Sequence, residues 1–150
     1  MRSAWTFLIS LTSFAPSVLA SPKYIFSFGE NWTSTGFSAT GPAPNAANPF
    51  GNPAFPGQTT PAGITNWLGH LTATFNKTQV LTYNYAVPNS VVDKNVFSTW
   101  SPVPSDLSDQ VGTFLGTNGN TPWNASNSLF SVFSGIWDIP SSFWVENSGE

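Results

Sequence analysis

Short apolar runs alternate with polar and turn-forming segments along the chain, and their spacing predicts three strands and two helices. The strands are expected at 23–28, 79–87 and 128–133, where aromatic and β-branched residues dominate. The helices are expected at 66–75 and 105–115, where apolar residues recur every three or four positions. The resulting order of strand, helix, strand, helix, strand predicts an α/β fold: a small parallel sheet with helices on its faces.

Each predicted helix has an expected apolar face and expected ends. The buried faces should comprise Trp67, Leu68, Leu71 and Phe75 in the first helix, and Leu107, Val111, Phe114 and Leu115 in the second. Ser105 is expected to cap the second helix and Gly116 to end it. Residues 38–62 carry six prolines and several glycines, which predicts a long surface loop that docks through Phe50 and Phe55.

The first twenty residues have the pattern of a secretory signal peptide. Arg2 precedes a short apolar run, and small residues surround the end of Val18-Leu19-Ala20. Cleavage after Ala20 would leave one domain, residues 21–150, outside the cell. The alternative interpretation of this run is a buried N-terminal helix. The run is too short for a helix that spans a membrane. The rest of the sequence contains no apolar stretch that would predict a membrane-spanning helix.

Charge and composition exclude several functions. After cleavage, three lysines would face seven acids, so the chain lacks the clustered cations that nucleic-acid binding needs. Its single histidine, absence of cysteine and scattered acids predict neither a metal site nor a cofactor, and no disulfide can form. Three sequons make Asn31, Asn76 and Asn124 candidate glycosylation sites.

The candidate site follows from the predicted sheet. Ligand sites of parallel sheets lie at the carboxyl ends of the strands, which here are the segments 29–33, 87–89 and 135–138. We expect these three segments to lie side by side.

Three sequence blocks at these strand ends, residues 26–37, 84–93 and 133–139, resemble those of secreted fungal SGNH (GDSL-type) hydrolases, and residues 52–57 resemble the loop after the first block. The likeness is strongest to the acetylesterases of carbohydrate esterase family sixteen. It implies a flavodoxin-like three-layer sandwich whose C-terminal part would follow Glu150. It also implies site positions: Asn31 for the nucleophile, Asn89 and Trp137 for the oxyanion donors, and Glu30 and Asp138 as supporting acids.

The chain departs from the family pattern where the chemistry occurs. Asn31 replaces the nucleophilic serine, and an amide cannot be activated to attack an ester. Asn89 follows Pro88, which has no amide hydrogen, and the bulky Trp137 stands in place of an asparagine. The closing Asp-x-x-His block has no counterpart before residue 150. We therefore expect a catalytically silent relative of these ester hydrolases.

Other interpretations remain open at this point. His70 is either a displaced base or, as we favour, an exposed helix residue. Glu30 and Asp138 are a remote candidate for a glycosidase pair. Most tryptophans of so small a domain should be core residues. Alternatively, tryptophans could line a cleft that binds a carbohydrate or acylated glycan. The candidates are Trp32, Trp100, Trp123, Trp137 and Trp144. A working ester hydrolase with differently placed catalytic residues is a further alternative, and an unpaired sheet edge predicts self-association.

Overall fold

The computed structural model describes residues 23–97, 105–118 and 120–147, with side chains up to residue 142. The expected signal peptide, its cleavage site and Trp100 lie outside these residues, as does the side chain of Trp144. Three strands form one parallel sheet in the order β2-β1-β3: β1 Lys23–Gly29, β2 Val80–Asn84 and β3 Ser128–Phe133.

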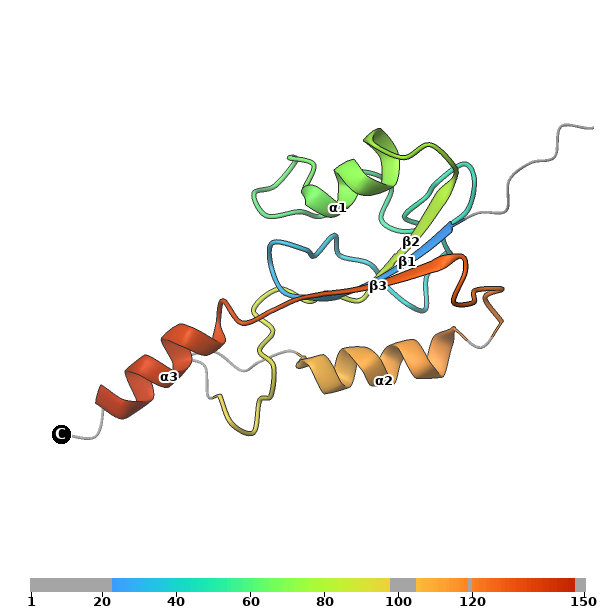
Figure 1. Ribbon diagram of the computed structural model, residues 1–150. Helices are drawn as coiled ribbons and strands as arrows, with labels where there is room; N and C mark the ends of the chain where they lie inside the picture. Colours follow the sequence, from blue (N-terminus) through green and yellow to red (C-terminus); the bar gives the residue numbers. More distant parts are fainter. Residues whose placement is uncertain (1–22, 98–104, 119, 148–150) are drawn as a thin grey trace, which may run out of the picture.

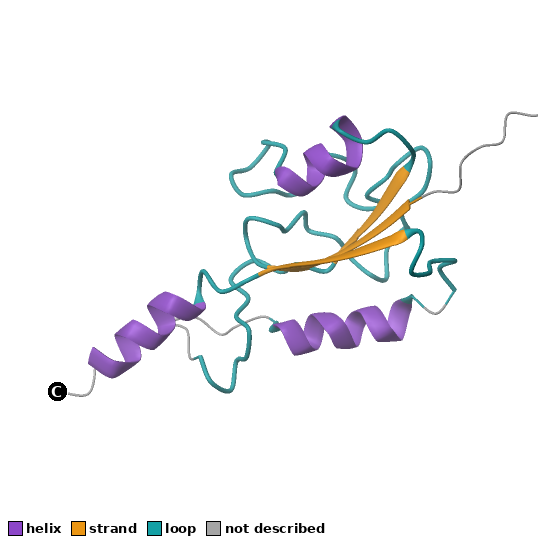
Figure 2. Ribbon diagram, in the orientation of Figure 1, coloured by secondary structure: helices purple, strands orange, loops and turns teal. Residues whose placement is uncertain are grey.

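Helices cover both faces of this sheet (Figures 1 and 2). The short helix α1 (Trp67–Gly69) runs on into the π-helix η1 (His70–Thr74) on one face, and α2 (Leu107–Thr117) covers the other. A third helix, α3 (Asp138–Asn147), was not expected from the sequence and extends away from the sheet beyond β3. The predicted α/β class, a partial flavodoxin-like sandwich around a parallel sheet, is confirmed.

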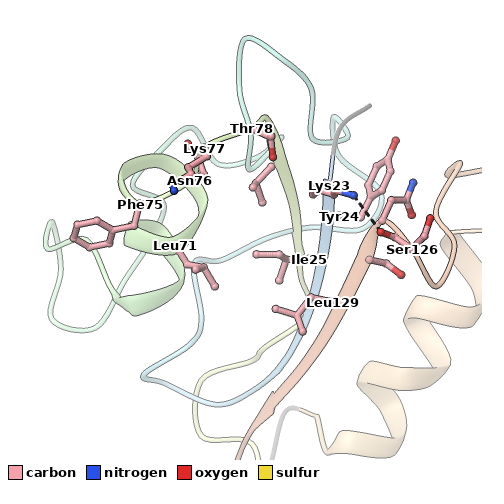
Figure 3. Close-up of a pocket in the computed structure, with 13 residues that line it drawn as sticks. Lys23, Tyr24, Ile25, Leu71, Phe75, Asn76, Lys77, Thr78, Ser126 and Leu129 are labelled. Atoms are coloured by element: carbon pink, nitrogen blue, oxygen red, sulfur yellow. Dashed lines mark hydrogen bonds between the residues drawn. The ribbon is translucent and has the colours of Figure 1, made fainter. Parts of the chain in front are cut away.

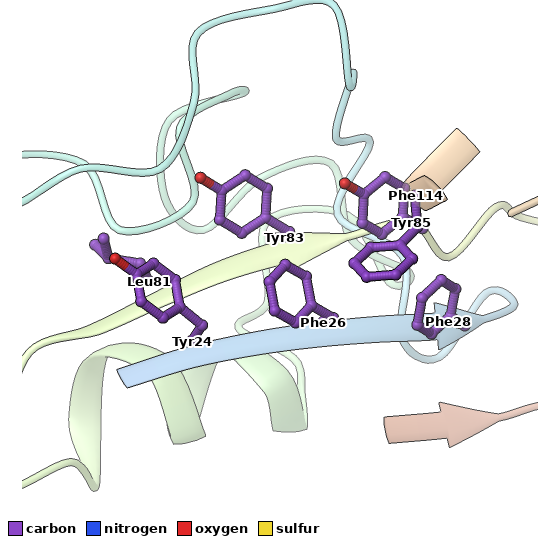
Figure 4. Packing of buried hydrophobic residues seen from close by; sticks show 7 residues of the cluster. All are labelled: Tyr24, Phe26, Phe28, Leu81, Tyr83, Tyr85 and Phe114. Atoms are coloured by element: carbon purple, nitrogen blue, oxygen red, sulfur yellow. The ribbon is translucent and has the colours of Figure 1, made fainter. Parts of the chain in front are cut away.

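An aromatic core fills the space between the sheet and α2 (Figure 4). Alternate residues of β1 point toward this helix, and Phe26 is fully buried among them. The Phe26 ring lies 5.3 Å from Tyr83 and 5.1 Å from Phe114, measured between centroids. Such ring pairs add about 0.5–1.5 kcal/mol each beyond the area that they bury. The sheet and α2 are therefore fixed to one another by ring packing.

The opposite face carries a smaller core of Ile25, Phe50 and Leu68. Phe50 comes from the proline-rich loop and is buried, and its ring stacks on the half-exposed Phe55 at 5.8 Å. Asn52 fixes the same loop, because its side chain bonds both backbone groups of Ser38 at 2.9 Å. The predicted docking of this loop is confirmed.

The predicted apolar face of the first helix is correct at Leu68 and wrong at the other three positions. Leu68, Gly69 and Thr72 are buried, whereas Trp67, Leu71 and Phe75 are exposed. The Thr72 hydroxyl lies 2.7 Å from the carbonyl of Leu68 and 2.6 Å from the hydroxyl of Thr82 on β2. A threonine whose hydroxyl is satisfied in this way is buried without penalty, and hydrophobic spacing cannot reveal it.

The start and the buried face of α2 also differ from the prediction. Asp106, not Ser105, is the N-cap, and it forms a reciprocal capping box with Asp109. The helix continues through Gly116 to Thr117. Gln110 and Phe114 are its buried residues, while the expected core residues Val111 and Leu115 are exposed. None of the helices in the described ranges is long and apolar enough to cross a membrane.

Candidate functional site

The carboxyl ends of the three strands meet, as the topology predicts. Gly29 closes β1 with φ +146°, and a side chain there would collide with β3, since its Cβ would lie 2.0 Å from the carbonyl oxygen of Phe133. Directly after it, the carbonyl of Glu30 accepts the backbone N–H groups of Thr33 and Ser34 at 3.0 and 2.9 Å. This tight turn presents Asn31 at the end of the sheet.

The side-chain amide of Asn31 joins all three segments. Its Oδ1 accepts the backbone N–H of Asn89 at 2.6 Å and the indole N–H of Trp137 at 2.7 Å. Asn89 adopts the left-handed conformation with φ 61°, which asparagine tolerates better than most residues. The donor belongs to Asn89 itself, so the missing amide hydrogen of Pro88 does not matter here. The structure thus brings together the three positions predicted for nucleophile and oxyanion donors.

Two N–H donors that converge on one carbonyl oxygen have the geometry of an oxyanion hole. Here the oxygen is supplied by the chain itself. With both donors engaged by Asn31, an external acyl oxygen could bind them only after the Asn31 side chain had moved. The site in this conformation is therefore closed by an internal acceptor.

Two buried acids lie behind the site. Asp138 begins α3, and its Oδ1 accepts the backbone N–H of Val92 at 2.8 Å, which holds the segment after β2 against α3. Glu30 is completely buried. Burial raises the pKa of Glu30, and the nearby charge of Asp138 raises it further; the backbone amides of Asn31 and Trp32 oppose this rise. Neither carboxylate oxygen of Glu30 has a partner with normal hydrogen-bond geometry.

Gln110 supports the site from α2, and sequence reasoning missed it. Its side chain accepts the N–H of Gly29 at 2.8 Å, donates to the carbonyl of Gly29 at 2.8 Å, and donates to the hydroxyl of Ser90 at 2.9 Å. It therefore connects the ends of β1 and the segment after β2 to the helix. The signal for it was its position, three residues after Leu107 and four before Phe114, on the face that those residues share.

The competing candidates are placed elsewhere or are inaccessible. His70 is exposed, and its described contacts are with the Thr74 hydroxyl at 3.5 Å and the Phe75 ring. Glu30 and Asp138 are both buried, so neither carboxyl group could reach a glycosidic bond in this conformation. No group of three or more His, Cys, Asp or Glu side chains within the described ranges could hold a metal ion.

The tryptophans are more exposed than expected. Trp32 beside Asn31 is 46% exposed and Trp137 is 37% exposed, so both contribute to the surface around the site. Trp67 and Trp123 also remain partly exposed, although Trp123 packs on Phe26. The expectation that most tryptophans are core residues is wrong for those described. Of the sequon asparagines, Asn76 and Asn124 are exposed and Asn31 is half-buried.

Several hollows in the described part of the chain lie apart from this site. A cavity of about 290 Å³ opens between η1 and the amino ends of β1 and β3, where Leu71, Ile25 and Leu129 point toward one another (Figure 3). Lys23 at its rim donates to the carbonyl of Ser126 at 3.1 Å. A second cavity of about 290 Å³ lies between Phe37, Tyr83 and the end of α2. Neither cavity includes Asn31, Asn89 or Trp137.

Comparison with known proteins links the chain to ester hydrolases. It is 37% identical over 131 residues to a curated protein named acetylesterase from Thermothelomyces thermophilus. The matched region is 85% of this chain but 43% of that relative, so the chain spans less than half of the relative's length. No protein-family model matches the chain, and no solved structure matches it significantly. The similarity supports an acetylesterase-like relationship.

Proposed function

We propose that this chain is a secreted relative of the SGNH-type acetylesterases that does not itself hydrolyse esters. The main observation behind this proposal is the hydrogen bonding of Asn31, whose amide oxygen accepts a hydrogen bond from each of the two N–H donors of the site. Its similarity to an acetylesterase supports the family, and its apolar N-terminal run supports export.

Physical chemistry supports the lack of activity. Losing the nucleophile or the histidine of a working triad costs roughly 10⁶ in rate. An oxyanion donor contributes about 10²–10³, and in this site both donors are engaged by Asn31. An amide at the nucleophile position cannot be deprotonated by a neighbouring base. The sequence holds one histidine, and His70 is exposed on η1 with no described contact to Asn31.

The test is acetate release from an activated aryl acetate by the unmodified chain and by Asn31→Ser. Neither should exceed the buffer rate, because the new hydroxyl would have no base to take its proton. Asn89→Gly keeps the backbone donor and Trp137→Asn exchanges the indole donor for an amide, so adding both to Asn31→Ser should add little activity. Turnover by the unmodified chain would overturn the proposal. Turnover by Asn31→Ser alone would reveal a base, and His70→Gln in that background would show whether it is His70.

Sugar binding is a second candidate function, favoured by one observation: Trp32 and Trp137 flank the closed site and expose substantial surface. Partly exposed aromatic rings beside amide groups suit a carbohydrate or acylated glycan, since such sites combine apolar surface with a few polar groups. A glycan-binding screen tests this function. Loss of the binding signal in Trp32→Ala, with retention in Trp123→Ala, would support it, and no binding by the unmodified chain would reject it.

A further inference from the structure

The cavity between η1 and the amino ends of β1 and β3 is lined by apolar side chains that the fold leaves partly exposed (Figure 3). Leu71 and Phe75, which were expected to be buried, are 38% and 75% exposed, and Leu129 of β3 is 52% exposed. These three side chains line the cavity together with the buried Ile25. Apolar surface gathered in one hollow often marks a ligand site.

The same cavity gathers positive charge. The cationic side chains of the described residues are Lys23, Lys77 and Lys94. Lys94 pairs with Asp106 and Asp109, whereas Lys23 and Lys77 line the cavity and form no ion pair with a described acid. The lining itself contains no aspartate or glutamate. In a chain with a net charge of −3, this hollow is therefore a place where an anion would meet attraction rather than repulsion.

The charged and apolar side chains of the cavity lie toward different ends. The aliphatic side chains point toward one another at one end, and Lys23 and Lys77 lie toward the other (Figure 3). The Lys23 ammonium donates to the carbonyl of Ser126 at 3.1 Å, which holds it at the rim. An ammonium group has three donors, so two of those of Lys23 can reach a ligand.

We propose that this cavity binds an alkyl carboxylate of medium chain length. The alkyl chain would lie on Leu71, Ile25 and Leu129, and the carboxylate would accept hydrogen bonds from Lys23 and Lys77. The volume of about 290 Å³ is at the lower end of the range of about 300–1,000 Å³ for ligand sites, which suits a single chain. This binding does not depend on whether the chain hydrolyses esters, because Asn31, Asn89 and Trp137 do not line the cavity.

The two parts of such a ligand contribute to affinity in different ways. Each methylene group that leaves water for the apolar end should tighten binding by up to about fourfold. Both lysines are exposed, so water and salt screen their attraction for the carboxylate, and each should contribute only about two- to fivefold. Chain length should therefore determine most of the affinity, and the charge should determine which alkyl compounds are preferred.

The experiment is an NMR titration of the full chain with sodium octanoate at concentrations below those at which octanoate forms micelles. The methyl resonances of Leu71, Ile25 and Leu129 should shift. Hexanoate, shorter by two methylene groups, should bind up to about 15-fold more weakly. The uncharged 1-octanol should bind several-fold more weakly than octanoate, and acetate, which has the charge without the chain, should cause no measurable shift.

Lys23→Gln and Lys77→Gln should each weaken octanoate binding about two- to fivefold and leave the binding of 1-octanol unchanged. Leu129→Ser should weaken the binding of both compounds, since it removes part of the apolar end. Lys94→Gln is the matched control, because it removes a lysine outside the cavity and should leave octanoate binding unchanged. Thermal unfolding of each variant shows that it is folded before its affinity is compared.

The unmodified chain alone can overturn the proposal. Absence of octanoate binding would reject it, as would equal affinity for octanoate and 1-octanol, because the lysines would then play no part. Shifts of the same methyl resonances with protein concentration, in the absence of octanoate, would also overturn it, since a second copy of the chain would then occupy the cavity. An equal loss of affinity in Lys94→Gln and Lys77→Gln would show that octanoate responds only to the overall charge.

Discussion

Replacing Gln110 by methionine should be among the most damaging single changes on α2. Methionine has nearly the same length and keeps the packing against the core, but it cannot donate or accept the three hydrogen bonds of the amide. Those bonds reach both backbone groups of Gly29 and the Ser90 hydroxyl, and Gln110 is 2% exposed. Water therefore cannot replace the lost partners without a rearrangement of the strand end.

The size of the effect follows from the groups left unpaired. Each buried donor or acceptor that loses its partner costs about 1–3 kcal/mol. The Gly29 carbonyl keeps the Val87 N–H at 3.1 Å, so the Gly29 N–H and the Ser90 hydroxyl are the groups that lose a partner, and together they give about 2–4 kcal/mol with partial relaxation. A domain of this size has about 5–15 kcal/mol in total. With a urea dependence near 2 kcal/mol per molar, the unfolding midpoint should fall by about 1–2 M.

Urea unfolding followed by tryptophan fluorescence measures this shift. Ser108→Met on the same helix is the matched control, because Ser108 is exposed and the change should stay within about 0.5 kcal/mol. Gln110→Glu keeps the acceptor for the Gly29 N–H but loses both donors, and it should be at least as damaging at neutral pH. A loss below about 1 kcal/mol in Gln110→Met would refute the view that this amide holds the strand ends in place.

Three further outcomes are expected. Gly29→Ala should destabilise the fold by more than about 3 kcal/mol, because the new Cβ would collide with the Phe133 carbonyl. Gly112→Ala is the control: the space around it is open, and the change should stabilise the helix by about 0.5–1 kcal/mol. Thermal unfolding measures both, and equal shifts in the two variants would contradict the predicted collision. Secreted material should begin close to Ser21, and N-terminal sequencing that finds another start counts against cleavage after Ala20. The exposed edge of β3 should promote self-association, so Val132→Lys, at a position 64% exposed, should lower the sedimenting mass; an unmodified chain that is monomeric at all concentrations would reject this.

The strands could be predicted from the sequence almost to the residue. Aromatic and β-branched residues dominate all three runs, and glycine or proline follows the first two. β1 and β2 are mostly buried, whereas most residues of β3 are exposed. The second was predicted too long, at 79–87, yet the chain keeps strand-like bonds to β1 after Asn84, with Tyr85 donating to Ser27 at 2.7 Å and Val87 to Gly29 at 3.1 Å. The predicted strand therefore differs from β2 mainly in the residue at which the strand is said to end.

The polar residues on the buried faces of the helices were missed for a common physical reason, although Leu68 and Phe114 were predicted correctly. Hydrophobic spacing treats a polar side chain as exposed, but Thr72 and Gln110 are buried because each hydrogen-bonds a group that the sheet or helix supplies. Those partners come from elements distant in sequence. Conversely, Leu115 fits an apolar pattern and is still 72% exposed, since no described element covers that side of α2.

Topology alone was enough to predict that the segments carrying Asn31, Asn89 and Trp137 would meet, and the family resemblance singled out these three residues, but their bonding was not predictable. It depends on the left-handed backbone of Asn89 and on the orientation of one indole ring. These are also the positions where the chain departs from the hydrolase pattern that it resembles. Because the amide oxygen of the first residue satisfies the donors of the other two, the three departures complement one another. A serine at position 31 alone would leave the Trp137 indole without its acceptor, so the substitutions are better understood as one hydrogen-bonded unit than as three independent losses.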